Sequence, residues 1–444
     1  MRKLVLDFET YYDTDVNLRK INTISYVNHP NFKVWGVGAK FLEDDTKSVA
    51  DQVAMRMGAL PAGWYGADDA EDFIRSIDWE NTEVICHNVN FDGFILTQHY
   101  GVTPAKFTCT ASMSRALFPN SSASLDAVSR RLFGGDEDMV KGDALPKAKG
   151  VVNLPPDLEK EIAEYCVQDV KLTEEIYKEF MKRGFPESEL ELIDLTTRMF
   201  VLPTLVADVP RLEAFYHSEK ERAEKTIKES GVDKKVLSSN KQFAEHLESL
   251  GLTVPKKVSP STGKRIPALG QKDFGYKNLM ADNPKHKKLW DAREAAKSRI
   301  QETRAMRFIT AVLNDGTIPM PLRYYGAHTG RFSGGESMNV QNMPRGSELR
   351  LSLTAPDDQL VYVIDLSQIE ARMLAWLAGE ESILKVFREN GDVYCAFGSI
   401  VYNMPINKDD HKEERFVAKT AVLGLGYGLG FNRFHEMMNI GAMG

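Results

Sequence analysis

Cysteine is scarce in this sequence, and long hydrophobic runs are lacking. The 444 residues include four cysteines, which stand far apart at Cys86, Cys109, Cys166 and Cys395. Without paired spacing they argue against a zinc site and for reduced thiols in a cytoplasm. No stretch approaches 18 uninterrupted apolar residues, so we expect no membrane span and no membrane partner. The first apolar run stops at Asp7, which is too early for a signal peptide.

An excess of positive charge is also lacking, because 56 Lys and Arg residues face 63 Asp and Glu residues, a net charge of −7. The charges are unevenly spread. Residues 211–310 carry 22 Lys and Arg against 13 Asp and Glu, an excess of 9, so the remainder carries −16. A basic middle between acidic ends suits a surface that follows a phosphate backbone, although a solvated helical bundle would have the same charges.

The length predicts two to four domains, and a hydrophobic content of 43% allows substantial cores. Residues 1–186 read as one α/β domain with strands followed by helices. We expect its strands at residues 3–8, 33–41 and 83–87, and its helices at residues 69–77, 124–133 and 157–182. A charged loop is expected at residues 134–150.

Residues 187–323 read as mainly helical, and a proline- and glycine-bearing basic loop interrupts them at 250–275. We expect helices at residues 189–200, 211–229 and 284–313. Aromatic, glycine and amide residues follow from 324, and further helices are expected at 382–389, at 392–402 and from about 408.

In the stretch 360–379 the pattern of apolar residues changes from that of a strand to that of a helix. Residues 360–364 are an apolar, β-branched run, which predicts a strand buried on both faces. Ser367 and Glu370 then spell a capping box that opens a helix, and the apolar stripe of this helix is Ile369, Met373, Leu374 and Leu377. Asp365 stands at the junction, where it would be either a metal ligand or a capping acid.

Three pairs of polar residues mark the first 186 residues. Asp7 and Glu9 lie two apart on a strand and so share a face, where a cation would relieve their repulsion. Each pair alone is weak, since strand acids and helical contacts are common. The other two pairs are spaced four apart. Asn88 and Asp92 follow the strand at 83–87, and Asp92 would begin a helix; Tyr165 and Asp169 lie on the expected helix at 157–182 and so share a face of it.

In this order the pairs resemble the DEDDy family of 3′–5′ exonucleases, which implies an RNase H-like fold for residues 1–186. The resemblance implies that Asp7, Glu9, Asp92 and Asp169 hold two divalent metal ions, Mg²⁺ or alternatively Mn²⁺. It implies that Tyr165 orients the attacking water and that Asn88 contacts DNA.

Three later segments resemble successive motifs of family A DNA polymerases. They are HTGRFSGGESMNVQNMPRG at 328–346, DLSQIEAR at 365–372 and RFVAKTAVLGLGYG at 415–428. Arg415 and Lys419 are one helical turn apart among apolar residues, a pairing that suits a triphosphate better than a solvated face. The resemblance implies a helical thumb at 187–323, a partial palm at 324–388 and partial fingers at 389–444.

The same resemblance assigns roles to residues on these motifs. Asp365 matches a palm metal ligand, and Glu370 matches the residue that excludes a 2′-hydroxyl, a role compatible with helix capping. Gln368 matches a residue at the minor groove and the nucleotide sugar. The implied primer-template contacts are Arg331, Gln341 and Asn342, and the implied nucleotide-binding face of the fingers is Arg415, Lys419, Leu423 and Tyr427.

The sequence departs from the polymerase pattern at two points. Leu423 stands where better-known members carry Phe or Tyr, which keeps the apolar contact with the sugar and loses the flat ring. The last palm motif, a His-Asp-Glu hairpin with the other metal-binding aspartate, is not found in these 444 residues. We therefore expect either a truncated product or one half of a split polymerase, completed by a second polypeptide.

The expected function is template-directed DNA synthesis with 3′–5′ proofreading. Its expected partners are primer-template DNA, dNTPs and a processivity factor, in the cytoplasm of a bacterium or phage-infected cell. Two alternatives stay open. The chain would be a 3′–5′ exonuclease whose polymerase part only binds primer-template, or a non-catalytic DNA-binding replication subunit.

Overall fold

The computed structural model describes residues 1–42, 63–134, 136–259, 262–271 and 273–439, and it divides into two compact units. The first unit contains Met1–Ser238 and Asp291–Leu360. The second contains Ser239–Trp290 and Val361–Gly444. This division does not test the domain boundaries expected after residues 186, 323 and 388, which stay predictions.

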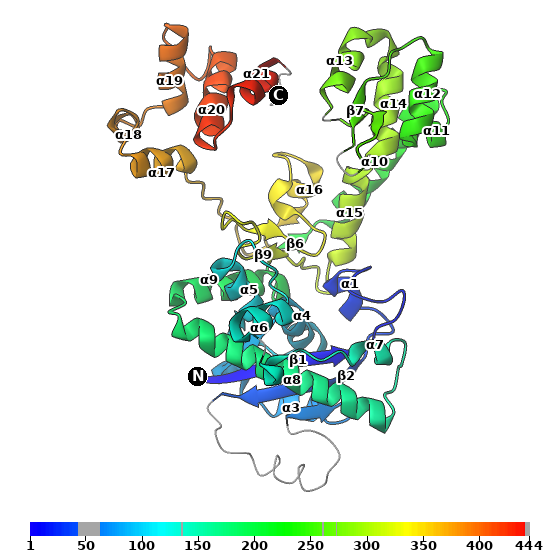
Figure 1. The fold of residues 1–444 in the computed structure, drawn as a ribbon, viewed down its shortest axis with the longest axis vertical. Helices are drawn as coiled ribbons and strands as arrows, with labels where there is room; N and C mark the ends of the chain where they lie inside the picture. The colour runs from blue at the N-terminus through cyan, green and yellow to red at the C-terminus, as the bar shows by residue number, and fades with distance from the viewer. Residues whose placement is uncertain (43–62, 135, 260–261, 272, 440–444) are drawn as a thin grey trace. The chain divides into compact units, whose positions relative to one another are not determined.

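A five-stranded sheet, counted in the described part of the chain, organises the first unit (Figure 1). The α/β prediction is confirmed, and so are the three expected strands, whereas the two edge strands were not predicted. The central strand β1 runs antiparallel to β2 and parallel to β4. In the order β3-β2-β1-β4-β5, the strands are Trp64–Gly66, Val34–Phe41, Arg2–Thr10, Thr82–Cys86 and Lys106–Cys109.

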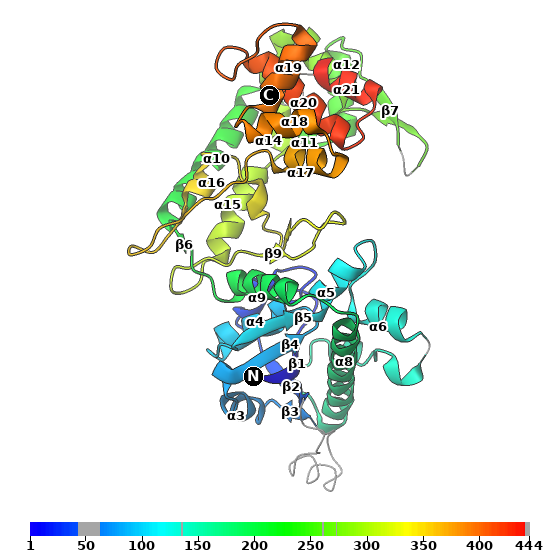
Figure 2. The same cartoon turned by 90° about the vertical axis from the view of Figure 1, so that its left-hand side faces the viewer.

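Helix α8, Pro156–Lys182, packs along the sheet against β1 and β2 (Figure 2). The expected helix at 157–182 is thus confirmed, and α6 begins where expected, with Ser124 as its N-cap. Helix α4 follows β4 directly and contacts α9. The remaining helices around the sheet are α1 Thr23–Val27, α3 Ala70–Arg75, α4 Val89–Phe94, α5 Thr110–Leu117, α6 Leu125–Phe133, α7 Leu145–Ala148 and α9 Glu187–Val201.

The sheet and α8 approach closely because a glycine separates them. Gly38 on β2 is the cross-strand partner of Asp7, and a Cβ atom at Gly38 would lie 2.8 Å from the Sγ atom of Cys166 on α8. A side chain at this position would push the helix away from the strand that carries Asp7. The glycine therefore sets the distance between β1 and the residues of α8.

Helices α10 and α15 pack side by side in the rest of the first unit. The single helix expected at 284–313 was wrong, because the chain forms three pieces: a 3₁₀ turn Pro284–His286, α14 and α15. Arg299 has non-helical dihedrals (φ −99°, ψ 31°), which break the helical hydrogen bonding before α15. The bounds are α10 Val209–Glu229, α11 Lys234–Ser238, α14 Lys287–Lys297 and α15 Ile300–Ala311.

Two short strand pairs tie residues 322–354 into the first unit. β9, Leu322–Arg323, pairs with β10, Ser333–Gly334, and β6, Val206–Ala207, pairs with β11, Leu353–Thr354. Among the described residues, hydrogen bonds join this segment to the helices around the sheet. They run from Arg115 Nε to the Tyr324 carbonyl (3.2 Å), from Tyr324 Oη to Glu189 (2.5 Å) and from the Thr23 amide to Glu336 (2.6 Å). α16, Glu348–Leu351, precedes β11.

The second unit is largely helical. Within residues 239–290, an antiparallel pair of strands, β7 and β8, occupies the expected loop at 250–275, of which residues 260, 261 and 272 lie outside the described part. None of the described helices in either unit is long and apolar enough to cross a lipid bilayer. The elements are α12 Asn240–Ser249, β7 Lys256–Val258, β8 Arg265–Pro267, α13 Phe274–Asp282, α17 Ile369–Ala378, α18 Glu381–Arg388, α19 Val393–Tyr402, α20 Lys412–Gly426 and α21 Phe431–Asn439.

The prediction of a buried strand at 360–364 was wrong. These residues form no strand and are 54–89% exposed, because no strand in the described part of the chain pairs with them. Asp365 is consequently exposed rather than held at a strand end. The expected capping box does not form either: α17 begins at Ile369 after Gln368, which has a left-handed φ of 56° and no capping side chain.

The core under α8 yields a stability prediction. Phe180 is fully buried in the main core cluster, so Phe180→Ala should leave a cavity and lower the free energy of unfolding by about 3–5 kcal/mol. Hydrogen exchange of the β1 amides, which reports opening of the sheet, should accelerate accordingly. Phe274→Ala is the control, because Phe274 is 50% exposed and its truncation should change stability by less than about 0.5 kcal/mol. Equal exchange in both variants would contradict the packing described.

Candidate functional site

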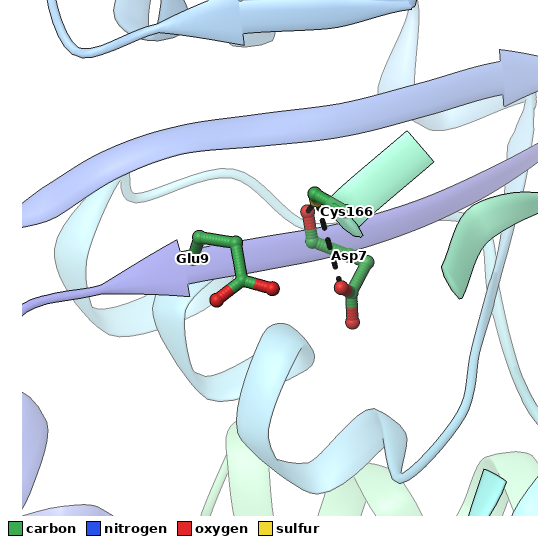
Figure 3. A group of neighbouring side chains, drawn as sticks. All are labelled: Asp7, Glu9 and Cys166. Atoms are coloured by element: carbon green, nitrogen blue, oxygen red, sulfur yellow. Dashed lines mark hydrogen bonds between the residues drawn. The ribbon is translucent and has the colours of Figure 1, made fainter. Parts of the chain in front are cut away.

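Two acids project from the same face of β1 (Figure 3). Asp7 is partly buried and Glu9 is 6% exposed. The register of β1 against β2 shifts between Glu9 and Thr10, which bends the strand at its end. The Sγ atom of Cys166 on α8 lies 3.6 Å from Oδ2 of Asp7. The strand thus presents two carboxylates toward one space.

A third acid comes from the turn after β4. Asp92 lies on α4, is 2% exposed, and accepts the amide hydrogen of Phe8 through Oδ1 (3.1 Å). This bond fixes the Asp92 carboxylate against the strand that carries Asp7 and Glu9. Asn88 stands before α4 with a left-handed φ of 81°, a conformation that Asn tolerates better than most residues.

The fourth acid lies on α8. Tyr165 and Asp169 are one helical turn apart and both are buried. Asp169 forms an ion pair through Oδ2 with the ammonium of Lys141. Its other oxygen, Oδ1, is buried and has no hydrogen-bond partner in the described part of the chain. A buried carboxylate oxygen without a partner is costly unless a cation binds there.

These side chains line one cavity of about 660 Å³. The structure thus brings together all the residues that the first three sequence pairs contributed: Asp7, Glu9, Asn88, Asp92, Tyr165 and Asp169. Their roles stay predictions. Sequence reasoning missed other lining residues, among them Tyr12, Arg19, Lys141 and Lys149.

Lys141 is the most informative of the missed residues. It belongs to the predicted charged loop at 134–150, where nothing in the spacing distinguishes it from other lysines. Its position depends on how the loop crosses α8: Gln168 donates hydrogen bonds to the carbonyls of Asp138 (2.8 Å) and Val140 (3.2 Å). The one available signal in the sequence was Gln168, which is three residues after Tyr165 and so lies near it on α8. It indicated a polar contact near the site, but it did not identify Lys141.

Burial and the nearness of the acids to one another raise their pKa values. Burial, and next the charge of Asp169, raise the pKa of Asp7 to about 7. Burial also raises the pKa of Glu9 and of Asp92 well above the usual range, and the charge of Asp7 acts in the same direction. Burial raises the pKa of the Tyr165 hydroxyl, so this group stays neutral. Each of these shifts would be relieved by a divalent cation among the acids.

The donor set fits a hard divalent cation. The ligand atoms of Asp7, Glu9 and Cys166 lie within 4.8 Å of one another, and carboxylate oxygens are the ligands that Mg²⁺ and Mn²⁺ prefer. Cys166 is not a suitable ligand, because burial raises its thiol pKa well above the usual range and keeps it protonated. The open oxygen of Asp169 adds a further donor.

A second group of predicted residues lies on α20 in the second unit. Arg415, Lys419 and Leu423 are on this helix, and Tyr427 is its C-cap. The guanidinium of Arg415 pairs with Asp392 at the start of α19, through Nη2 (2.6 Å) and Nε (2.9 Å). Asp392 was missed by sequence reasoning, because its pairing with Arg415 depends on the packing of two helices.

An apolar groove of about 330 Å³ between α17 and α20 brings Glu370, Leu423 and Tyr427 together. Arg415, Lys419 and Gln368 do not line it. The side-chain Oε1 atom of Gln368 is buried without a hydrogen-bond partner among the described residues.

The predicted primer-template residues lie in the first unit. Arg331 is exposed in the turn between β9 and β10, and Gln341 and Asn342 are exposed in a 3₁₀ turn, Val340–Asn342. They do not share a cavity with the acids around Asp7.

Family models match most of the chain. A model described as DNA polymerase family A matches residues 208–443, and a model described as 3′–5′ exonuclease matches residues 59–184. The sequence is 26% identical to a DNA polymerase of Bacillus phage SP02 over 96% of this chain and 69% of that protein. It is 29% identical to a thermostable DNA polymerase I of Thermus filiformis over 52% of this chain, which is 28% of that enzyme.

A solved structure has a similar fold. It is described as the POL domain of Pol1 from M. smegmatis in complex with DNA primer-template and dNTP. The alignment covers 92% of this chain and 67% of that one, with a TM-score of 0.60 and 16% identity. This likeness extends the match to the fold of both units.

The raised pKa of Asp7 predicts how metal stabilisation depends on pH. The folded-state pKa is about 7 against an ordinary value of 3.8, so the stability that this group contributes is complete below pH 3.8 and is lost as the pH rises to 7. Metal binding requires the ionised form, so Mg²⁺ should raise the melting temperature more at pH 8 than at pH 6.

Differential scanning fluorimetry with Mg²⁺ or EDTA at both pH values measures this effect. The dependence should weaken in Asp7→Asn and persist unchanged in Asp15→Asn, a control whose side chain is 87% exposed. A Mg²⁺ effect of the same size at pH 6 and pH 8 would count against a metal site at Asp7.

Proposed function

Because this chain belongs to DNA polymerase family A and carries a 3′–5′ exonuclease domain, we propose that it removes nucleotides from the 3′ end of DNA in the cavity around Asp7. The observation that carries the proposal is the convergence of four acids on this cavity, three of them buried and one of these with an unpartnered oxygen. The polymerase region would bind primer-template and dNTP. The chain spans 69% of its phage relative and 28% of the Thermus enzyme. DNA synthesis, the activity in the names of these relatives, is therefore a proposal for this protein.

In the proposed exonuclease, Asp7, Glu9, Asp92 and Asp169 would hold two Mg²⁺ ions, with Mn²⁺ as an alternative. When bound, such ions stabilise the attacking and the departing oxygens of a phosphoryl transfer. The chain's own groups do the rest. The Phe8 amide keeps Asp92 oriented, and the neutral hydroxyl of Tyr165 would orient the attacking water. The products would be a shortened strand and a nucleoside 5′-monophosphate.

For the polymerase region, the proposed nucleotide site centres on α20. Arg415 and Lys419 would bind the triphosphate, and Asp392 would keep the Arg415 guanidinium in one orientation. Leu423 would pack on the nucleotide sugar, with Tyr427 close by, and Glu370 would exclude a 2′-hydroxyl. Gln368 would contact the minor groove.

The proposed primer-template contacts are Arg331, Gln341 and Asn342, with the basic residues at 211–310 following the phosphates. The M. smegmatis polymerase of similar fold is described with primer-template and dNTP, which supports this assignment. The proposal also includes Asp365 as a palm metal ligand, a second polypeptide with the other palm carboxylate, and a processivity factor.

Degradation of a labelled primer-template tests the exonuclease. With Mg²⁺ and no dNTP, the chain should shorten the primer from its 3′ end, and Asp7→Ala/Glu9→Ala should slow this by at least about a thousandfold, because removing ligands abolishes metal binding. Asp15→Ala is the matched control, since it removes an exposed acid near β1. Unchanged degradation in the double variant would refute the assignment.

The same labelled primer-template distinguishes a polymerase from an exonuclease that only binds primer-template and from a non-catalytic DNA-binding subunit. Primer extension after dNTP addition indicates polymerisation by these 444 residues, whereas degradation alone indicates an exonuclease with a binding region. DNA binding without either reaction, unaffected by the double variant, would favour a non-catalytic subunit.

Leu423 predicts altered discrimination between deoxy- and dideoxynucleotides. Since leucine lacks the flat ring, Leu423→Tyr should change the ratio of chain-terminator to dNTP incorporation, on the order of tenfold or more. Extension assays in the complete protein with mixed ddNTP and dNTP measure the ratio. Val422→Ile is the control, because Val422 lines the same groove from the neighbouring position. Equal ratios in parent and Leu423→Tyr would rule out this role for Leu423.

A further inference from the structure

Lys141 is held in the acidic cavity by the way its loop crosses α8. Gln168 hydrogen-bonds the carbonyls of Asp138 and Val140, and Lys171 donates to the Asp138 carbonyl (3.3 Å). From the other side, Ser129 on α6 donates to the Met139 carbonyl. The backbone on the N-terminal side of Lys141 is therefore bonded to two helices.

The loop also passes directly over Tyr165. A Cβ atom at Gly142 would lie 3.0 Å from Cδ2 of Tyr165, and the Lys141 ammonium is 4.8 Å from the centre of the Tyr165 ring. The ammonium of Lys141 thus lies over the face of an aromatic ring and also pairs with an oxygen of Asp169. Such a placement is a built contact rather than a chance surface pair.

The charge of Lys141 acts on most of the acidic cluster. It lowers the pKa of Asp7, of Glu9 and of Asp169, against the effect of burial on each. Without a metal ion, this ammonium partly compensates the charge of the acids that it contacts. With a metal ion on Asp169, the ammonium and the metal would repel each other across one carboxylate.

The two carboxylate oxygens of Asp169 have different partners, which would allow a metal ion to replace the Lys141 ammonium. Oδ2 is paired with Lys141, whereas Oδ1 is buried and has no hydrogen-bond partner in the described part of the chain. The Lys141 side chain is 27% exposed, and its flexible stem can carry the ammonium out to solvent, whereas that of Asp169 is 4% exposed and cannot follow.

We propose that Lys141 is the resident counter-cation of this site, which neutralises Asp169 in the metal-free protein and which a divalent ion bound at Asp169 displaces. The proposal rests on the proposed exonuclease site. Lys141 is thereby a positioning residue: it keeps the acids assembled before metal binds, and it weakens metal binding by competing for Asp169. Metal affinity and metal-free stability should consequently change in opposite directions when its charge is removed.

Substitution of Lys141 tests the exchange. Lys141→Met keeps an unbranched side chain of similar length and removes the charge, and Lys141→Arg keeps the charge. Lys149→Met is the matched control, because Lys149 lines the same cavity but forms no ion pair in the described part of the chain. For each full-length protein, isothermal titration with Mn²⁺ gives the dissociation constant, and fluorimetry in EDTA gives the metal-free melting temperature.

Lys141→Met should bind Mn²⁺ about tenfold more tightly and melt at a lower temperature in EDTA. Lys141→Arg should stay close to the parent in both measurements, and Lys149→Met should be unchanged. Equal or weaker Mn²⁺ binding by Lys141→Met overturns the exchange, and so does an unaltered melting temperature in EDTA.

The parent protein distinguishes this failure from a failure of the proposed function. If the parent binds Mn²⁺ and Asp7→Ala/Glu9→Ala does not, the exonuclease site stands, and only Lys141→Met decides the exchange. If the parent binds no Mn²⁺, both the site and the exchange are refuted.

Discussion

Mutual repulsion among buried carboxylates is the constraint on which the first unit depends. Asp7, Glu9, Asp92 and Asp169 come from three different elements and share one cavity, where burial makes their charges expensive. An acidic cluster of this kind persists only if positive charge compensates it. Lys141 supplies one such charge, and the open oxygen of Asp169 indicates where more can be bound.

The fold supports this cluster by placing rigid elements around it. β1 is the central strand of the sheet, and its two acids lie where it pairs with β2, so they are held on a strand and not on a loop. Gly38 lets α8 approach the same strand, which brings Asp169 within reach, and the Phe8 amide holds Asp92. The strand that presents the acids therefore also orients one of their neighbours through its backbone.

Local periodicity explains which parts of the molecule were predictable. Asp7 and Glu9 follow from the period of a strand, and Tyr165 with Asp169 from the period of a helix, because each pair needs only its own element. Lys141 depends on a loop that folds back on α8, and no spacing encodes that path. The strand expected at 360–364 was wrong for a related reason, because pairing depends on distant partners that an apolar run does not specify.

Three hydrogen bonds described above have a mechanical consequence: Arg115 donates to the Tyr324 carbonyl, Tyr324 donates to Glu189, and the Thr23 amide donates to Glu336. They attach the turn that carries Arg331 to the helices around the sheet. The turn and the acidic cavity should therefore move together. If the proposed contacts hold, a DNA strand bound at that turn reaches the acids without a domain movement. Its 3′ end would have to unpair and cross a fixed surface, so the stability of the last base pairs would set the rate of proofreading.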